Sequence, residues 1–306
     1  MRRRTAGPAA SVLVAASLLA ACTGADAPSA GPAAEPDVVG IAVGRDTVSV
    51  AAAGDIARNP GNGRGTADLI GGMRPDAVLA LGDLAYQDGS AAEFRENYEP
   101  TWGAFKAITR PIPGNHEYGT KDATGYFDYF RSQIGGRPYY AWDAGRWRMY
   151  ALNCDIECGS DSPQLAWLRE DLARHRGTPA LAYVHEPLYT CSTRHPPARR
   201  VDDIWKTLQE AGGQLLLSGN NHAYERFAAL DAKGAPSPNG MRQFVVGTGG
   251  VSLYPLVNPC EHREAQVDSA MGVLQLELRA DAYSWRFVAV DGRVLDEGSQ
   301  AVRAAG

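Results

Sequence analysis

The sequence has no excess of positive charge, no hydrophobic run long enough to span a bilayer comfortably, and no Cys-x-x-Cys pair. Its 30 basic and 35 acidic residues leave a formal net charge of -5, which disfavours nucleic acid as a partner because binding to a phosphate backbone needs a basic surface. The chain also has no internal repeat and no convincing linker to a second domain. With 44% hydrophobic and 21% charged residues, its 306 residues suffice for one large core or two modest ones.

The first residues resemble a bacterial lipoprotein signal. Three arginines precede an apolar run rich in alanine, valine and leucine, which ends at Leu19-Ala20-Ala21-Cys22. The run is short, so a cleaved signal over residues 1–21 is a better interpretation than a transmembrane helix. The resemblance implies a lipid on Cys22 that anchors an extracytoplasmic protein to the outer face of the cell membrane, with no other membrane contact. An ordinary signal peptide with an incidental cysteine is the alternative.

Residues 22–46 are rich in alanine, proline and glycine and have little periodic apolar pattern. That composition predicts a flexible linker. The folded domain is then expected over residues 47–300.

Four cysteines lie in this domain, and an even number outside the reducing cytosol predicts two disulfides. Among the three possible connectivities we prefer a small loop closed by Cys154 and Cys158 and a long loop closed by Cys191 and Cys260. A zinc site made of the four cysteines is the alternative, which the spacing disfavours.

Apolar, strand-like runs along the domain stop repeatedly at polar residues: VSVAAAGD, AVLALGD, RPIPGN, PALAYVH and QLLLSGNNH. Helical patterns intervene at about residues 64–74, 91–107, 162–176 and 198–212, so strand and helix alternate as in an α/β protein. After Asn220 strands predominate, which predicts a second sheet packed on the first. Because parallel strands bring their carboxyl ends to one edge of a sheet, we expect the polar residues to meet there.

The polar residues at these strand ends supply hard oxygen and imidazole donors, both common ligands of metal ions. They are Asp55, Asp83, Tyr86, Asn115, His116, His185 and His222. Two metal ions that share one carboxylate can bind both the attacking and the leaving oxygen of a phosphoryl transfer. The residue types therefore predict a two-metal site.

Five segments in order resemble the motif blocks of the calcineurin-like metallophosphoesterases: GDIA, GDLAY, GNHE, VHEPLY and GNNHAYER. Tyr86, at the end of GDLAY, narrows the resemblance to the purple acid phosphatases, and the match spans about residues 47–250. The resemblance implies an α/β fold, namely a four-layer α/β/β/α sandwich of two mixed sheets.

The resemblance also implies the ligands of the first metal, a ferric ion (Fe³⁺). They are Asp55, Asp83, Tyr86 and His222, with Asp83 bridging the two metals. Many relatives have a histidine two residues after the first aspartate, where this chain has Ala57. The phenolate of Tyr86, a hard anionic ligand suited to a trivalent ion, compensates for it.

For the second metal, a divalent zinc, iron or manganese ion, the resemblance implies Asp83, Asn115 and His185. The family's fourth ligand is the first histidine of Gly-His-x-His, and this position is Asn220 here. An amide oxygen is a poorer donor than imidazole to these ions, so the second metal is expected to bind more weakly. Asn220 either coordinates through its carbonyl oxygen or holds a water.

Further roles follow from the same resemblance. His116 matches the residue that hydrogen-bonds phosphate or assists the leaving group. His195 lies about where relatives carry substrate-side histidines, with a solvated surface position as the alternative, and Arg194 faces either phosphate or solvent. Glu225 and Arg226 are expected to orient His222 and its loop.

The predicted function is hydrolysis of phosphate monoesters of small molecules. Two alternatives remain open. One is a phosphodiesterase on the same scaffold, and the other is a degenerate binding module that lost full activity through Asn220.

Overall fold

The computed structural model describes residue 38 and residues 40–303. The predicted signal peptide, Cys22 and most of the predicted linker therefore lie outside the described residues. Within that part of the chain, no helix is both long and apolar enough to cross a membrane.

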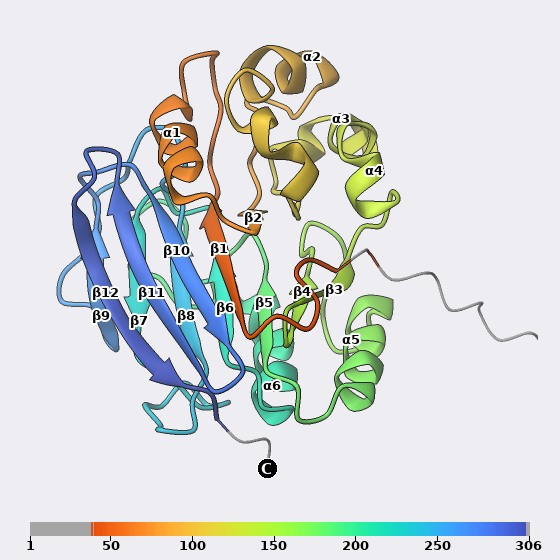
Figure 1. The fold of residues 1–306 in the computed structure, drawn as a ribbon, viewed down its shortest axis with the longest axis vertical. Coiled ribbons are helices and arrows are strands. Elements are labelled where there is room, and N and C mark those ends of the chain that lie inside the picture. The colour runs from red at the N-terminus through yellow and green to blue at the C-terminus, as the bar shows by residue number, and fades with distance from the viewer. Residues whose placement is uncertain (1–37, 39, 304–306) are drawn as a thin grey trace, which may run out of the picture. The chain divides into compact units, whose positions relative to one another are not determined.

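Two mixed sheets form the centre of the fold (Figure 1). The five-stranded sheet has the order β12-β11-β10-β1-β2, and its strands are β1 (Thr47–Ala53), β2 (Ala77–Ala80), β10 (Gly272–Arg279), β11 (Ala282–Ala289) and β12 (Val294–Ala301). The seven-stranded sheet has the order β3-β4-β5-β6-β8-β7-β9, and its strands are β3 (Tyr140–Ala144), β4 (Trp147–Ala151), β5 (Ala180–Tyr183), β6 (Leu215–Ser218), β7 (Tyr224–Phe227), β8 (Arg242–Val246) and β9 (Arg263–Val267).

Helices flank the sheets: α1 (Arg64–Met73), α2 (Ala91–Glu93), α3 (Thr124–Tyr129), α4 (Arg131–Ile134), α5 (Pro163–Arg174) and α6 (Asp202–Glu210). Helix α5 begins where the sequence favours it, because the Ser162 hydroxyl accepts the Leu165 amide hydrogen and proline occupies the first helical position. Helix α1 packs against β10, while α5 and α6 pack on the other sheet.

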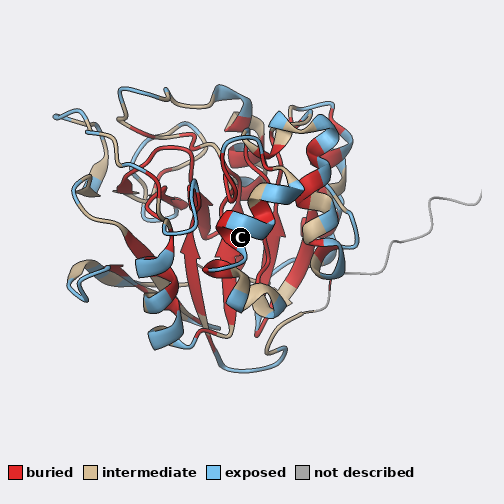
Figure 2. Cartoon of the chain, turned by 90° about the horizontal axis from the view of Figure 1, so that it is seen from above, coloured by how far each residue is buried: buried red, intermediate tan, exposed pale blue. Residues whose placement is uncertain are grey.

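Strand β5 shows how the sequence builds the layers. Leu181 and Tyr183 belong to the large core between the two sheets, whereas Ala180 and Ala182 belong to the second core under α5 and α6. This period of two is that of a strand buried on both faces. Figure 2 shows the result, with buried strands inside and helices exposed along their outer sides. The predicted four-layer arrangement of two mixed sheets is confirmed.

The structure corrects two expectations about elements. The helix expected over residues 91–107 is interrupted at residues 99–101: Ala91–Glu93 continues directly into Phe94–Tyr98, and a separate helix, Trp102–Ile108, follows. Pro100 lies in the interruption and cannot donate a helical hydrogen bond. The run RPIPGN forms only an isolated bridge between Ile112 and Leu81, because prolines on both sides of Ile112 cannot donate to a ladder.

The second sheet is also built differently from the expectation. Strands after Asn220 do not form it alone: β7, β8 and β9 extend the seven-stranded sheet, while β10 pairs with β1, and β11 and β12 follow outward from β10. As a result, the polar residues after β1 and β2 approach the site from one sheet, and those after β5 and β6 approach it from the other.

Candidate metal centre

The loops after β1 and β2 are joined by their backbones. The Asp55 amide donates to the Gly82 carbonyl at 3.0 Å and the Ile56 amide to the Asp83 carbonyl at 2.9 Å. Asp55 and Asp83 have positive φ angles of 61° and 53°, which non-glycine residues rarely adopt and which concentrate at functional sites. Both carboxylates are therefore held in an unusual backbone conformation that neighbouring hydrogen bonds maintain.

Two glycines of the motifs allow the loops to approach closely. A Cβ atom on Gly82, whose φ is 86°, would lie 2.3 Å from Nδ1 of His185. A Cβ atom on Gly114 would lie 2.3 Å from Oδ1 of Asp83. Any larger residue would displace a candidate ligand.

Three side chains gather on one side of Asp83, and we call Asp55, Tyr86 and His222 the tyrosine half of the centre. The Tyr86 hydroxyl lies 3.0 Å from Oδ1 of Asp55 and 3.1 Å from Oδ2 of Asp83. Nε2 of His222 lies 3.2 Å from Oδ1 of Asp55 and 3.4 Å from the Tyr86 hydroxyl. The Tyr86 hydroxyl has one hydrogen and can donate it to only one of the two carboxylates. Oxygen lone pairs without a hydrogen therefore face one another on this side.

We call Asn115, His185 and Asn220 the asparagine half. Nε2 of His185 lies 3.3 Å from Oδ1 of Asp83, and candidate ligand atoms of Asp55, Asp83 and His185 all lie within 4.8 Å of one another. Asn115 is exposed, and Asn220 contacts the centre through its backbone amide, which donates to Oδ2 of Asp55 at 2.9 Å. This half is therefore more open at Asn115, whereas His185 and Asn220 are buried.

The histidines themselves test whether the residues fit metal ions. Nδ1 of His185 contacts the Leu81 carbonyl at 2.8 Å, and Nδ1 of His222 contacts the Ser252 carbonyl at 2.6 Å. Since a carbonyl only accepts, both Nδ1 atoms carry hydrogen and the lone pairs of neutral rings lie on Nε2. Nε2 of His185 is buried without a hydrogen-bond partner among the described residues. Lone pairs that face carboxylates in this way fit a cation between them.

The pKa values of the candidate ligands also show that the site favours positive charge. Burial lowers the pKa of His222, but Asp55, the Ser252 carbonyl and Asp83 together raise it more, so the net shift is upward. Burial also lowers the pKa of His185, and the surrounding carboxylates, Asp83 foremost, together raise it well above its usual value. Burial raises the pKa of Asp83, yet the charges and hydrogen bonds of His185 and His116 together outweigh it, and the pKa falls to about 2. Burial and Asp55 raise the pKa of the Tyr86 phenol. A phenolate here therefore needs a compensating cation.

Glu117 supports the centre in a way that the sequence reasoning missed. This fully buried carboxylate accepts the amide hydrogens of Asp83, Leu84 and Gly114 at 2.8–2.9 Å, and that of Ala85 at 3.2 Å. Burial raises its pKa to about 8, although the amide hydrogen bonds oppose the shift. The only signal in the sequence was its place at the end of GNHE.

His116 lies beside the tyrosine half. Its Nδ1 contacts the Gln87 carbonyl at 2.6 Å, its Nε2 lies 3.7 Å from Oδ2 of Asp83, and its ring centroid lies 4.3 Å from that of Tyr86. Nδ1 therefore donates to the carbonyl and Nε2 faces the centre. Gln87 was not predicted as part of the site.

His195 approaches the centre through Tyr254, another residue that the sequence reasoning missed. The Tyr254 ring stacks on His222 with centroids 4.0 Å apart, and it lies 5.9 Å from His195. Burial lowers the pKa of His195, Asp55 opposes this, and the charges of His222 and His185 lower it further; the net shift is downward, so a neutral ring is favoured. Tyr254 lies in an irregular segment without periodic pattern, which left no sequence signal.

Glu225 and Arg226 have other partners than the expected ones. Glu225 accepts from the Thr190 hydroxyl, the Cys191 amide and Arg263. Arg226 pairs with Asp296 and Glu264. The contacts of His222 described above involve neither residue, so Glu225 supports the loop at Thr190 and Arg226 braces the sheets.

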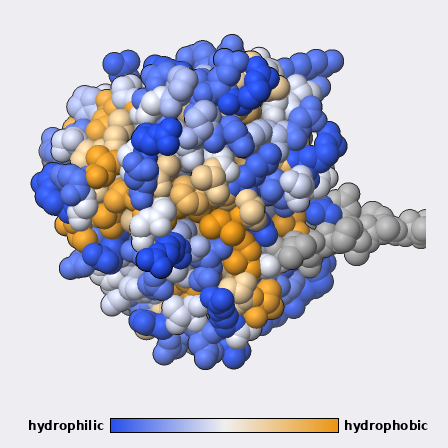
Figure 3. Space-filling view, turned by 45° about the horizontal axis from the view of Figure 1, so that its top comes forward, coloured by the Kyte–Doolittle hydropathy of each residue, from blue (hydrophilic) through white to orange (hydrophobic). Residues whose placement is uncertain are grey.

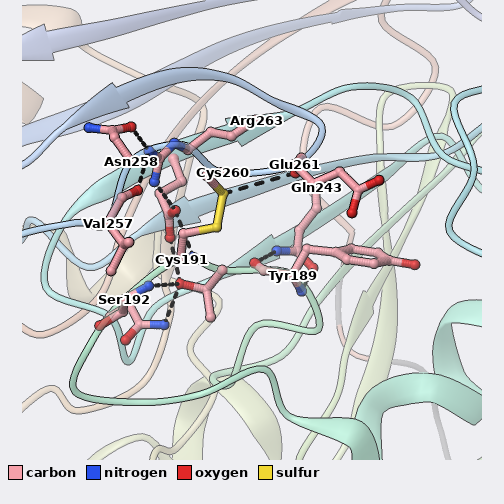
Figure 4. Close-up of a disulfide and its surroundings, with 12 residues drawn as sticks. Tyr189, Cys191, Ser192, Gln243, Val257, Asn258, Cys260, Glu261 and Arg263 are labelled. Carbon is pink, nitrogen blue, oxygen red and sulfur yellow. Dashed lines mark hydrogen bonds and ion pairs between the residues drawn. A yellow bond between two sulfur atoms is a disulfide. The ribbon is translucent and has the colours of Figure 1, made fainter.

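The two predicted disulfides, Cys154–Cys158 and Cys191–Cys260, are both formed. Figure 4 shows the second one, which joins the loop after β5 to the segment before β9. The Val257 amide donates to the Cys191 carbonyl at 2.9 Å beside it. His195 and Tyr254 thus lie on two segments that are covalently tied.

Residues 48–224 match the family model of the calcineurin-like phosphoesterases, and this segment is more than half of the chain. The chain belongs to this family. Among curated proteins, the chain is similar to purple acid phosphatase 23 of Arabidopsis thaliana, 28% identical over 216 residues that cover 58% of this chain and 47% of the relative. Purple acid phosphatase 15 of the same plant is 26% identical over 216 residues, 58% of this chain and 40% of the relative. The chain thus spans less than half the length of these relatives.

Solved structures show the same fold. A purple acid phosphatase from yellow lupin (Lupinus luteus) seeds has a TM-score of 0.69 at 17% identity, over 85% of this chain and 55% of that one. The anchor in the inner membrane complex of Plasmodium has a TM-score of 0.67 at 12% identity, over 85% of this chain and 90% of that one. Identities this low show the likeness of the fold alone.

Proposed function

We propose that this phosphoesterase hydrolyses phosphate monoesters at a centre of two metal ions like that of the purple acid phosphatases. The observation that carries the proposal is the orientation of His185 and His222, whose Nδ1 atoms are fixed by carbonyls and whose Nε2 atoms face Asp83 and Asp55. The similarity to purple acid phosphatases supports it.

In this proposal the tyrosine half, with Asp83 between the halves, holds a ferric ion, and Asp83, Asn115 and His185 hold a divalent zinc, iron or manganese ion. The ions supply Lewis-acid activation of the phosphate and of water. The chain supplies the rest. His116, whose Nδ1 is committed to Gln87, exchanges a proton at Nε2 with the leaving alcohol. The pKa of His195 is lowered, so its imidazole is neutral, and in this form it orients the ester.

The test is metal analysis of the purified protein together with two chromogenic esters. We expect about two metal ions per chain and faster cleavage of p-nitrophenyl phosphate than of bis(p-nitrophenyl) phosphate. Faster cleavage of the diester would replace our proposal by a phosphodiesterase. One metal ion and no turnover, even with added iron, zinc or manganese, would favour the degenerate binding module.

We also propose that the enzyme is an extracytoplasmic lipoprotein anchored through Cys22, on the strength of the N-terminal sequence pattern. A Cys22→Ser variant is expected to leave the membrane fraction of expressing bacteria. Retention of this variant in the membrane would contradict lipid anchoring.

A further inference from the structure

Two arginines lie at the rim of the metal centre. Each lies against an aromatic ring: one ring is the candidate ligand Tyr86, and the other is Tyr254, which contacts the candidate ligand His222. Cζ of Arg58 lies 5.1 Å from the ring centroid of Tyr86. Cζ of Arg194 lies 5.3 Å from the ring centroid of Tyr254, which stacks on His222. The guanidinium groups therefore flank the centre from two different loops.

Neither arginine is committed to an acidic partner. Both are exposed, and neither forms an ion pair with any residue in the described part of the chain. Arg148 offers a contrast, since it is buried and pairs with Asp171 and Asp143. Arg58 and Arg194 consequently keep their hydrogen-bond donors free for an anion.

The backbones that carry the two arginines are held in place. The Asn97 amide donates to the carbonyls of Arg58 and Tyr86 at 3.3 and 3.1 Å. The Arg194 amide donates to the Ser192 hydroxyl at 3.1 Å, three residues after the disulfide at Cys191. The loop bearing Arg194 is thus held at Ser192, next to the disulfide-bonded Cys191 (Figure 4).

Charges from the centre and from the rim meet at the Tyr254 phenol. Burial raises its pKa, Asp55 raises it further, and Arg58 and Arg194 both lower it. Both guanidinium groups therefore lie near enough to Tyr254 to act on its phenol, as the carboxylate of Asp55 does.

We propose that Arg58 and Arg194 form a second phosphate-binding position, so that the preferred substrates are phosphate esters whose leaving group carries another phosphate. This proposal rests on the proposed function, because the scissile phosphate binds at the metal centre. Water cleaves its P–O bond, and phosphate and an alcohol that still bears the second phosphate are released. The planar guanidinium fork matches two phosphate oxygens at once, which the compact charge of lysine does not.

The test uses a matched pair of sugar phosphates and the metal-loaded full chain. Fructose 1,6-bisphosphate and fructose 6-phosphate differ in the second phosphate, so the ratio of their kcat/KM values reports its recognition. We expect the wild type to favour the bisphosphate, and Arg58→Gln and Arg194→Gln each to lower the ratio about tenfold, as charge-assisted hydrogen bonds imply. Arg176→Gln, at an exposed arginine beside α5, is the control and should leave the ratio unchanged.

Calorimetric binding of the same two sugars separates this inference from the proposed function. A bisphosphate preference in binding that both variants lose, without turnover of either sugar, would overturn the proposed function and keep the second phosphate position. Turnover with equal kcat/KM values, or equal binding of both sugars, would overturn the second position alone. A ratio of kcat/KM values that neither variant changes would also overturn the second position.

Discussion

The two halves of the metal centre differ in how much of their geometry exists before any ion binds. In the tyrosine half, buried side chains of Asp55, Tyr86 and His222 already lie 3.0–3.4 Å apart. In the asparagine half, Asn115 is exposed and Asn220 reaches the centre through its backbone. A preorganised site loses less conformational entropy when it binds, so the tyrosine half should hold its ion more tightly.

Asp83 tests whether the halves are coupled, and Asp83→Asn should have the largest effect. We expect both metals to be lost and phosphatase activity to fall by about 10³-fold or more, because an amide removes the charge that both ions share. Plasma emission analysis and p-nitrophenyl phosphate assays measure this. Asp68→Asn, on the exposed face of α1, is the control. One metal retained at full stoichiometry would show that the halves bind independently.

Tyr86→Phe tests the tyrosine half alone. We expect about a 100-fold loss of affinity for ferric ion, since losing a ligand costs on the order of 3 kcal/mol, and loss of the purple colour of a ferric phenolate in any protein that retains iron. Absorption spectroscopy with iron analysis gives the answer. Tyr254→Phe should keep the colour. A coloured Tyr86→Phe protein would assign the phenolate to another tyrosine.

The pH dependence of stability tests the surroundings of Asp155, a carboxyl group on the His185 side of the centre. Burial raises its pKa to about 6, against the opposing charges of His185 and Arg200. A raised carboxyl pKa means that the folded state holds the proton more tightly, so this contribution to stability is present at low pH and is lost as pH rises through about 6. Between pH 4 and 7 the metal-free wild type should therefore lose about 2 kcal/mol relative to Asp155→Asn.

Urea denaturation of both metal-free proteins measures that difference. If the two stability profiles run parallel across this pH range, burial does not hold the proton on Asp155. A smaller difference after addition of a divalent ion would place that ion's charge near Asp155.

The smallest expected effect concerns Asn220→His. Restoring imidazole should raise the affinity for the second metal about tenfold, since imidazole is the better donor. The backbone amide of residue 220 still donates to Asp55 in the variant, so the tyrosine half should be unchanged. Metal titration of the protein already loaded with iron measures it. Unchanged affinity would show that the side chain at 220 is not a ligand.

The sequence predicted well those features that are repeated and local. Asp55, Asp83, His185 and His222 each follow an apolar run and lie in a motif, and the structure brings all four together. The division of strands between two sheets was not predictable from the pattern, because β10 pairs with β1 across more than 200 residues of sequence.

Other parts of the site left little trace in the sequence. Tyr254 lies in an irregular segment where no period marks its ring for the site, and only the fold places it on His222. In the sequence, Glu117 was recognisable only as the last residue of GNHE, because its four backbone partners depend on how the loops meet. The sequence also did not predict where hydrophilic and hydrophobic residues gather on the surface; on the face in Figure 3 they form mixed patches.

The disulfide between Cys191 and Cys260 makes part of the site depend on the redox state of its surroundings. It ties the loop bearing Arg194 to the segment bearing Tyr254, and such a bond persists only in an oxidising compartment. The same segment carries the Ser252 carbonyl that fixes Nδ1 of His222. Reduction of this bond would therefore loosen one candidate metal ligand together with the proposed second phosphate position, so selectivity would be a property of the compartment as much as of the chain.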